Sequence, residues 1–214
     1  MDNIFFSKIT LRKSYSNQYD LHQSLWYLFP DIPDAKSHFL FSVENKTNDY
    51  TQVILFSKSI PQTRVISDIQ IKSHGPYALQ SSNNTKLSNS IIFEQGSSYR
   101  FKLTANPTKK ISDPNGKKNK KGEIRKLRIA LYKENERVEW LRRKLSEGAE
   151  ISELFVKNLE PVYFKKKGQS GKVVPAHFEG LIRVTDENKF KELWLKGIGP
   201  AKAFGCGLLL LKRV

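Results

Sequence analysis

Most of the chain alternates between hydrophobic and polar positions with the period of a β-strand, and three segments switch to helical spacing. Near the start, the strand patterns lie at residues 4–12, 38–44 and 51–58. A helix is predicted from Tyr19 to Phe29, where Pro30 ends it. The polar residues 45–49 predict a turn, so the second and third strands are expected to form a hairpin. Strand, helix, strand, strand is the opening of a ferredoxin-like βαββαβ unit; residues 65–72 give a weaker strand pattern, and the second helix is not evident.

A second set of elements follows a Ser- and Asn-rich stretch at residues 80–90, which is typical of a linker. The strand patterns lie at residues 99–105, 127–132, 162–164, 173–184 and 208–212. Helices are expected at residues 134–147 and 186–196, and a loop at residues 168–171. We therefore predict an α+β fold with antiparallel sheets in two tandem domains, residues 1–79 and 96–214, joined by a linker at 80–95.

The first predicted helix has an apolar face beside a face that carries proton-handling groups. The apolar face holds Leu21, Leu25, Leu28 and Phe29. Tyr19, His22 and Trp26 lie on the adjoining face, with a phenol and an imidazole one turn apart. Such a pair at the edge of a cleft is suited to proton transfer. From the residues alone, a helix histidine without any catalytic role is an equally good interpretation.

The net charge of the 214-residue chain is its most informative property about binding partners. Lys and Arg number 37 against 21 Asp and Glu, which gives a formal net charge of +16. This excess favours a polyanionic partner, with nucleic acid ahead of a membrane surface. The single cysteine, Cys206, excludes an internal disulfide and a cysteine-built zinc site. Because the sequence shows no signal-peptide pattern and no apolar run of about 18 residues, we expect a cytoplasmic protein without a membrane partner.

The positive charge is concentrated in residues 106–128, a segment with four Pro and Gly residues between two strand patterns. Its cationic residues are Lys109, Lys110, Lys117, Lys118, Lys120, Lys121, Arg125, Lys126 and Arg128. A long basic hairpin can track phosphates or enter a nucleic-acid groove, and the alternative is a solvated, disordered loop. Arg142 and Arg143 on the following helix could extend the same basic face or belong to the helix's solvated side.

The C-terminal segment from Gly197 to Gly207 is rich in glycine. A helix precedes this segment and a strand follows it, so it is not a dinucleotide-binding fingerprint, and it lacks the Gly-Lys-Ser/Thr of a P-loop. Glycines of this kind either form a tight structural turn or let the backbone approach a phosphate. The residues alone leave both interpretations open.

Several motifs, in order along nearly the whole chain, resemble the CasE (Cse3) family of CRISPR-associated endoribonucleases from type I-E systems. They are Tyr19–Pro30, Phe39-Leu40-Phe41, Phe101–Pro107, Ser170-Gly171-Lys172, Phe178-Glu179-Gly180, Gly197–Lys202 and Gly205–Leu209. Residues 58–93 match least. The resemblance implies two ferredoxin-like (RRM-like) domains. It also implies metal- and cofactor-independent cleavage of the CRISPR repeat at the 3′ base of its stem-loop, with the product held in the Cascade complex beside other Cascade subunits.

The same resemblance implies a division of roles at the site. His22, Tyr19 and Lys172 would be catalytic, with attack of a ribose 2′-oxygen on the adjacent phosphate. The RNA would be held by the basic hairpin, Arg142 and Arg143, and by Ser170, Gly199, Lys202, Gly205 and Gly207. Two alternatives are a non-catalytic RNA-binding module with tandem RRM-like sheets and a purely structural Cascade subunit. An aromatic-rich RNP pattern, which RRM sheets use to stack bases, is not evident in the sequence.

Overall fold

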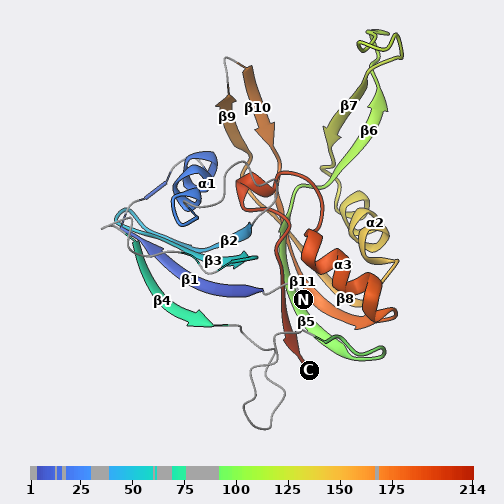
Figure 1. The fold of residues 1–214 in the computed structure, drawn as a ribbon. Helices are drawn as coiled ribbons and strands as arrows, with labels where there is room; N and C mark the ends of the chain where they lie inside the picture. Colours follow the sequence, from blue (N-terminus) through green and yellow to red (C-terminus); the bar gives the residue numbers. More distant parts are fainter. Residues whose placement is uncertain are drawn as a thin grey trace.

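The computed structural model describes residues 4–12, 14–15, 18–29, 39–59, 61, 69–75, 92–166 and 169–214. Two four-stranded antiparallel sheets stand side by side, and two hairpins project from the same end of the molecule (Figure 1). Tandem antiparallel α+β units, as the sequence predicts, are therefore confirmed. No described helix has the length and apolar character needed to cross a membrane.

The first sheet has the strand order β2-β3-β1-β4, which is the order of a ferredoxin-like unit. Its elements are β1 (Phe5–Leu11), α1 (Gln18–Trp26), β2 (Phe39–Lys46), β3 (Thr51–Ser57) and β4 (Ile69–Gly75). Alternate residues such as Ile9, Val53 and Phe41 point to one face, where they pack against Leu21 and Leu25 of α1. The predicted hairpin of β2 and β3 is confirmed by their antiparallel pairing. Most of the segment between β3 and β4, where a second helix was not evident, lies outside the described residues.

Helix α1 is shorter than the sequence pattern indicates. It ends at Trp26, and the amides of Tyr27, Leu28 and Phe29 donate to carbonyls three residues earlier. This tighter last turn follows from Pro30, which disfavours a helical conformation at the residue before it. Leu28 and Phe29 nevertheless remain buried, as the apolar stripe predicts.

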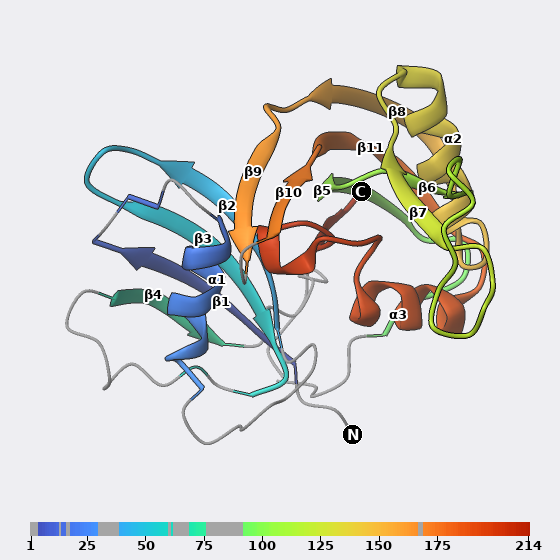
Figure 2. The same cartoon turned by 90° about the horizontal axis from the view of Figure 1, so that it is seen from above.

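The second sheet has the order β12-β5-β11-β8 and completes a βαββαβ unit. Its elements are β5 (Ser98–Ala105), α2 (Glu134–Leu145), β8 (Ala149–Asn158), β11 (Ala176–Val184), α3 (Glu187–Lys196) and β12 (Leu209–Arg213). Both helices cover one face of this sheet (Figure 2), where Tyr99, Phe101 and Leu103 of β5 are buried. Asp186 begins α3 by accepting a hydrogen bond from the amide of Lys189.

Two hairpins are inserted into this unit. Strands β6 (Thr108–Ser112) and β7 (Lys126–Ala130) lie between β5 and α2, and strands β9 (Val162–Lys166) and β10 (Gln169–Val173) lie between β8 and β11. The predicted loop at residues 168–171 is therefore wrong, because residues 169–171 belong to β10. A single strand at 173–184 is also wrong, since Pro175, which has no amide to donate, separates β10 from β11. Strand β8 was not predicted.

The two sheets share a continuous core. Leu40 and Phe56 of the first sheet belong to the same buried cluster as the second sheet. The Trp194 ring of α3 lies 4.8 Å from that of Phe56 and 5.8 Å from that of Phe6. This packing fixes α1 relative to the second unit. The predicted linker falls mostly on residues 80–91, outside the described part, so the domain boundaries stay a prediction.

Candidate active site

Tyr19 and His22 lie one turn apart on the same face of α1, and both are half-buried. Their ring centroids are 6.3 Å apart and the ring planes are inclined by 27°. The helical spacing predicted this pairing of a phenol with an imidazole. The arrangement is suited to acting on two neighbouring oxygens of one substrate.

Aromatic side chains surround the imidazole of His22. The rings of Phe39 and Phe41 from β2 lie 5.2 and 6.2 Å away, and that of Trp26 lies 6.1 Å away, edge to face. The Nδ1 atom is buried. These contacts fix the orientation of the ring, while the side chain as a whole keeps contact with solvent.

A short 3₁₀ helix of the second unit, η1 (Lys202–Phe204), packs against α1. Its Phe204 ring lies 6.0 Å from the ring of Tyr19 and 4.6 Å from that of Phe164 on β9. Phe164 in turn lies opposite Gly171 of β10, where an added Cβ would come within 2.3 Å of the ring. Helix α1 and the β9/β10 hairpin are therefore linked through three aromatic rings.

A cavity of about 150 Å³ opens at this junction. Its lining comes from both units: Gln18 of α1, Val43 of β2, Thr104 of β5, Leu159, Glu160, Val162, Val173, Pro175, Phe204 and Gly205. Gln18 immediately precedes Tyr19, so the cavity begins beside the candidate catalytic pair. The junction can therefore admit part of a substrate next to α1.

Lys172 and Ser170 lie on β10, in a strand rather than a loop. Lys172 is exposed, and its ammonium lies 5.3 Å from the ring centroid of Tyr163 and 5.8 Å from that of Tyr132. Hydrogen bonding to the hydroxyl of Tyr163, and then to that of Tyr132, raises the pKa of Lys172 above its ordinary value. The side chain is therefore a fixed positive charge, of the kind that stabilises a phosphate.

Backbone conformation and close packing both require glycine at several positions of the C-terminal segment. Gly199, Gly205 and Gly207 all have positive φ, between 73° and 98°. A Cβ on Gly199 would come within 2.8 Å of the Trp140 ring, and one on Gly205 within 3.2 Å of Phe41. Of the two interpretations left open by the sequence, the tight turn thus has direct support from packing, and phosphate contact stays a prediction.

Lys202 also has a structural contact. Its ammonium donates to the carbonyl of Lys196, the last residue of α3. Burial, and then repulsion from Lys196, lowers the pKa of Lys202. A cation at this position complements the negative end of the helix dipole, so its predicted contact with RNA is not needed to explain it.

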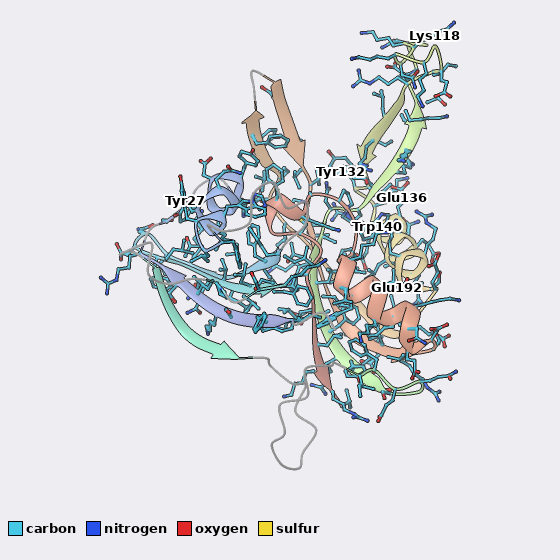
Figure 3. All side chains as sticks on the ribbon, viewed as in Figure 1. Tyr27, Lys118, Tyr132, Glu136, Trp140 and Glu192 are labelled. Atoms are coloured by element: carbon cyan, nitrogen blue, oxygen red, sulfur yellow. The ribbon has the colours of Figure 1, made fainter. Side chains whose placement is uncertain are left out.

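The basic segment is a hairpin with defined turns rather than a disordered loop. Lys118 pairs with Ile124 beyond the end of β6 and β7, and the side-chain oxygen of Asn119 accepts from the amides of Lys121 and Glu123. Residues 114–126 are all exposed, and Lys118 lies at the far tip of the projection (Figure 3). Towards the base, Lys109 pairs with Glu136 at 3.1 Å and Lys126 donates to Ser112. Most of the charge therefore points to solvent, available to a polyanion.

The arginines of α2 divide into two kinds. Arg142 and Arg143 are exposed, with Arg142 donating to the carbonyl of Ile151 at 3.3 Å. Arg137, by contrast, is buried and donates to the Leu131 carbonyl and to the side chain of Asn158. It fixes the base of the β6/β7 hairpin to the end of β8.

The face of the second sheet away from its helices carries a polar network. His177 contacts Thr104 through Nδ1 at 3.2 Å and Glu179 through Nε2 at 2.9 Å, and Lys102 pairs with Glu179 at 3.2 Å. The His177 contact, and then that of Lys102, lowers the pKa of Glu179. An RRM would present base-stacking aromatics on these central strands. Among the described residues, no group of three or more His, Cys, Asp or Glu is placed to hold a metal ion.

Three aromatic residues of the site were missed by sequence reasoning: Tyr132, Tyr163 and Phe204. A signal for one existed, because antiparallel pairing of the neighbouring strands β9 and β10 places Tyr163 directly opposite Lys172. Tyr132 and Phe204 reach the site through tertiary packing, for which the local pattern holds no signal.

Comparison with known proteins identifies a family and several relatives of similar sequence. A family model described as CRISPR associated protein matches residues 4–213. The Cascade subunit CasE of Escherichia coli K12 is 35% identical over 210 residues, which are 97% of this chain and 98% of that protein. The CRISPR-associated endoribonuclease Cse3 of Thermus thermophilus is 34% identical over 127 residues, covering 53% of this chain and 55% of that protein.

The solved structures include the CRISPR-associated protein Cas6e of Escherichia coli K-12. It superposes with a TM-score of 0.75 and 33% identity, over 98% of this chain and all of that one. The strand orders of both sheets agree with the tandem ferredoxin-like domains of this fold. The chain belongs to the CRISPR-associated protein family that contains CasE and Cse3.

Proposed function

We propose that this protein is an endoribonuclease that cleaves CRISPR repeat stem-loops in precursor RNA without a metal ion or cofactor and then stays bound to the product. The observation that carries the proposal is the stacked pair of Tyr19 and His22 at 6.3 Å, at the junction of two ferredoxin-like units and on a strongly basic chain. The Thermus thermophilus relative is named an endoribonuclease, which supports the same activity here.

In the proposed reaction, the ribose 2′-oxygen attacks the adjacent phosphorus and the 5′-oxygen of the next nucleotide leaves. The first product carries a 2′,3′-cyclic phosphate, which water can open to a 3′-phosphate. One group must take the 2′-OH proton and another must protonate the leaving oxygen. His22 is suited to either step, each worth about 10²–10⁴-fold in rate, and Tyr19 to positioning the 2′-OH or to the second transfer.

Lys172 supplies the positive charge for the phosphate in this proposal. A lysine is already protonated throughout the neutral range at its ordinary pKa of 10.5, and the two tyrosine contacts raise the pKa of Lys172 further. An ordered cation needs no reorganisation when charge develops on the phosphorane, which is the condition for effective electrostatic stabilisation. The hairpin that carries Lys172 packs against α1 through Phe164 and Phe204. In this proposal, that packing holds Lys172 at a constant position relative to His22.

The RNA duplex is proposed to lie along the β6/β7 hairpin. Its tip carries the exposed Lys117, Lys118, Lys120 and Lys121, and Arg125 and Arg128 are exposed nearer its base. An A-form major groove is narrow, so the hairpin would engage it at the end of the stem and rely on phosphates. The polar network around His177 and Glu179 argues against base stacking on the second sheet in the manner of an RRM.

We further place the protein in the cytoplasm, with other Cascade subunits as partners and no membrane partner, as the Cascade context of the Escherichia coli relative supports. The domains proposed are residues 1–79 and 96–214 with a linker at 80–95. The end of β4 at Gly75 and the start of β5 at Ser98 are consistent with that division.

The decisive experiment incubates the protein with its repeat RNA in EDTA and sizes the products. The wild-type protein should cleave at one position, and His22→Ala should lower the single-turnover rate by about 10²–10⁴-fold while the repeat remains bound. His177→Ala is the matched control, because this half-buried histidine belongs to the network on the other sheet. It should keep the wild-type rate within about threefold.

Three outcomes would overturn the proposal. Full cleavage by His22→Ala would remove the proposed catalytic group. Loss of wild-type cleavage in EDTA, restored by a divalent ion, would replace the mechanism by a metal-dependent one. Tight repeat binding with no cleavage by the wild-type protein would favour the non-catalytic RNA-binding module instead.

A further inference from the structure

Two exposed tyrosines flank Lys172 in the space between the two projecting hairpins. Tyr163 lies on β9 directly opposite Lys172 of β10, and Tyr132 follows β7 at the base of the basic hairpin. Tyr132 lies between the two hairpins and below their tips (Figure 3). One ammonium within 5.3 and 5.8 Å of the two ring centroids holds these three side chains together, although they come from different hairpins.

Both tyrosine side chains are largely exposed to solvent, although each contacts the Lys172 ammonium. Tyr132 is 58% exposed and Tyr163 is 69% exposed, whereas Tyr99, Phe93 and Phe101 are almost completely buried. Neither tyrosine belongs to either hydrophobic core. The Lys172 ammonium lies over both rings, and much of each ring remains accessible to a flat ligand.

Two open aromatic rings beside a fixed cation match the chemistry of one unpaired nucleotide. A base stacks on a tyrosine ring because every base has a π-face, and a phosphate pairs with the ammonium. The internal base pairs of a duplex cannot occupy the same site, since both faces of each base are already stacked on neighbouring bases. The lysines on the neighbouring hairpin supply the duplex-binding surface instead.

We propose that Tyr132, Lys172 and Tyr163 form a subsite for the unpaired nucleotide at the foot of the repeat stem, with its base on the tyrosines and its 5′-phosphate, which is the scissile phosphate of the proposed reaction, on Lys172. This inference rests on the proposed function, because it requires the RNA stem to lie against the β6/β7 hairpin. The tyrosines are binding residues that select a single-stranded nucleotide beside the duplex. They thereby define where the stem ends and help place the scissile phosphate against α1.

The test compares two uncleavable RNAs, each with a 2′-deoxy nucleotide at the cleavage position. One carries the repeat stem-loop with unpaired nucleotides on both sides, and the other is the same stem-loop trimmed flush. Tyr132→Ala and Tyr163→Ala should each weaken binding of the flanked RNA by about 5- to 150-fold, since stacking contributes about 1–3 kcal/mol per base. Binding of the flush stem-loop should stay within about twofold of wild type.

Conservative variants separate stacking from a merely structural contact with Lys172. Tyr132→Phe and Tyr163→Phe remove the hydroxyls that contact Lys172 but keep the rings, so both should bind the flanked RNA within about threefold of wild type. Phe155→Ala, a control on the 71% exposed aromatic of β8, should change neither affinity. With 2-aminopurine at the unpaired position, wild-type protein should quench its fluorescence and the Tyr→Ala variants should not.

The outcomes distinguish this inference from the proposed function. If wild-type protein binds both RNAs and the Tyr→Ala variants lose equal affinity for each, or none, the subsite is refuted while the endoribonuclease stands. Loss of affinity in Tyr→Phe as large as in Tyr→Ala would likewise refute stacking. If wild-type protein binds neither RNA, the proposed function fails and the subsite fails with it.

Discussion

The ring of Phe204 lies 6.0 Å from the ring of Tyr19, and this contact joins the C-terminal glycine segment to the helix that carries His22. Because the Phe204 ring also lies 4.6 Å from the Phe164 ring, it is the middle of a path from helix α1 to the hairpin that carries Lys172. Tyr19 and Phe204, which are 185 positions apart in the sequence, thereby meet at one junction.

Removing the middle ring should impair catalysis more than binding. Phe204→Ala is expected to lower the single-turnover cleavage rate by about tenfold or more, because small displacements of reacting groups are costly. The Kd for an uncleavable repeat should change by less than about threefold. Phe155→Ala is the control for loss of an aromatic side chain outside this path. An unchanged rate in Phe204→Ala would show that the contact does not position Tyr19.

Gly171→Ala tests the same path from the other end. The new Cβ would come within 2.3 Å of the Phe164 ring, so the ring or the strand must move. We expect at least about a fivefold loss of cleavage rate. The midpoint of thermal unfolding should change little, since β9 and β10 pair with each other outside both four-stranded sheets. A large fall in that midpoint without loss of rate would contradict this role.

The charge of the hairpin tip should appear in the salt dependence of RNA binding. Replacing Lys117, Lys118, Lys120 and Lys121 by alanine should weaken binding and reduce the slope of log Kd against log salt by about 2–4. A charge-matched control replaces Lys102, Lys157, Lys189 and Lys212, which lie on the second sheet and α3. An equal reduction in both variants would mean that the hairpin has no special part in phosphate contact.

Gly199 should be required for stability rather than for RNA contact. Gly199→Ala combines a φ of +80° with a Cβ 2.8 Å from Trp140 and should lower the free energy of unfolding by about 2–4 kcal/mol. Gly122→Ala is the matched control, because Gly122 has the same φ of +80° with no atom within 4 Å. Denaturant unfolding measures both, and equal losses would show that backbone strain alone explains the glycine.

Cys206 should be inert in the folded protein. Burial raises the pKa of its thiol to about 12 from an ordinary value of 9.0, so at pH 8.5 the reactive thiolate is about 10³-fold rarer than in the unfolded chain. Alkylation by iodoacetamide should therefore be slow until denaturant is added. Fast alkylation of the native protein would contradict the burial.

The same thiol has a consequence for stability at high pH. The unfolded chain releases its thiol proton near pH 9, whereas the folded chain keeps it until about pH 12. This contribution to stability is complete below pH 9 and is lost as the pH rises towards 12. In Cys206→Ala that part of the pH dependence should disappear, which denaturant unfolding between pH 8 and 10.5 can measure.

Local sequence patterns predicted the strands whose buried and exposed residues alternate regularly and the helices with clear end signals. Strand β5 has a strict alternation of buried and exposed residues, and α3 has both an Asp186 cap and a glycine at its end, so both were found. The pairing of Tyr19 with His22 also follows from helical spacing alone. What these patterns lack is any information about partners distant in sequence.

The missed strands have such distant causes. In β8, the polar pair Ser152 and Glu153 breaks the alternation, and a bulge opposite Leu181 and Ile182 absorbs the extra residue. In β10, Gly171 suggests a loop, but Phe164 lies directly across from it and covers the space that a side chain would fill. The contacts of Lys172 with Tyr132 arise only when two hairpins meet, so spacing could not predict them.

Both hairpins interrupt the βαββαβ order of the second unit without contributing strands to its sheet. The β6/β7 hairpin also carries none of the proposed catalytic residues, so its length and sequence can change while the core that aligns α1 with η1 is preserved. Under the proposed function, the hairpin can then be adapted to a different repeat sequence without any change to the site on α1. Transplanting residues 108–130 between relatives should accordingly move repeat preference along with the hairpin.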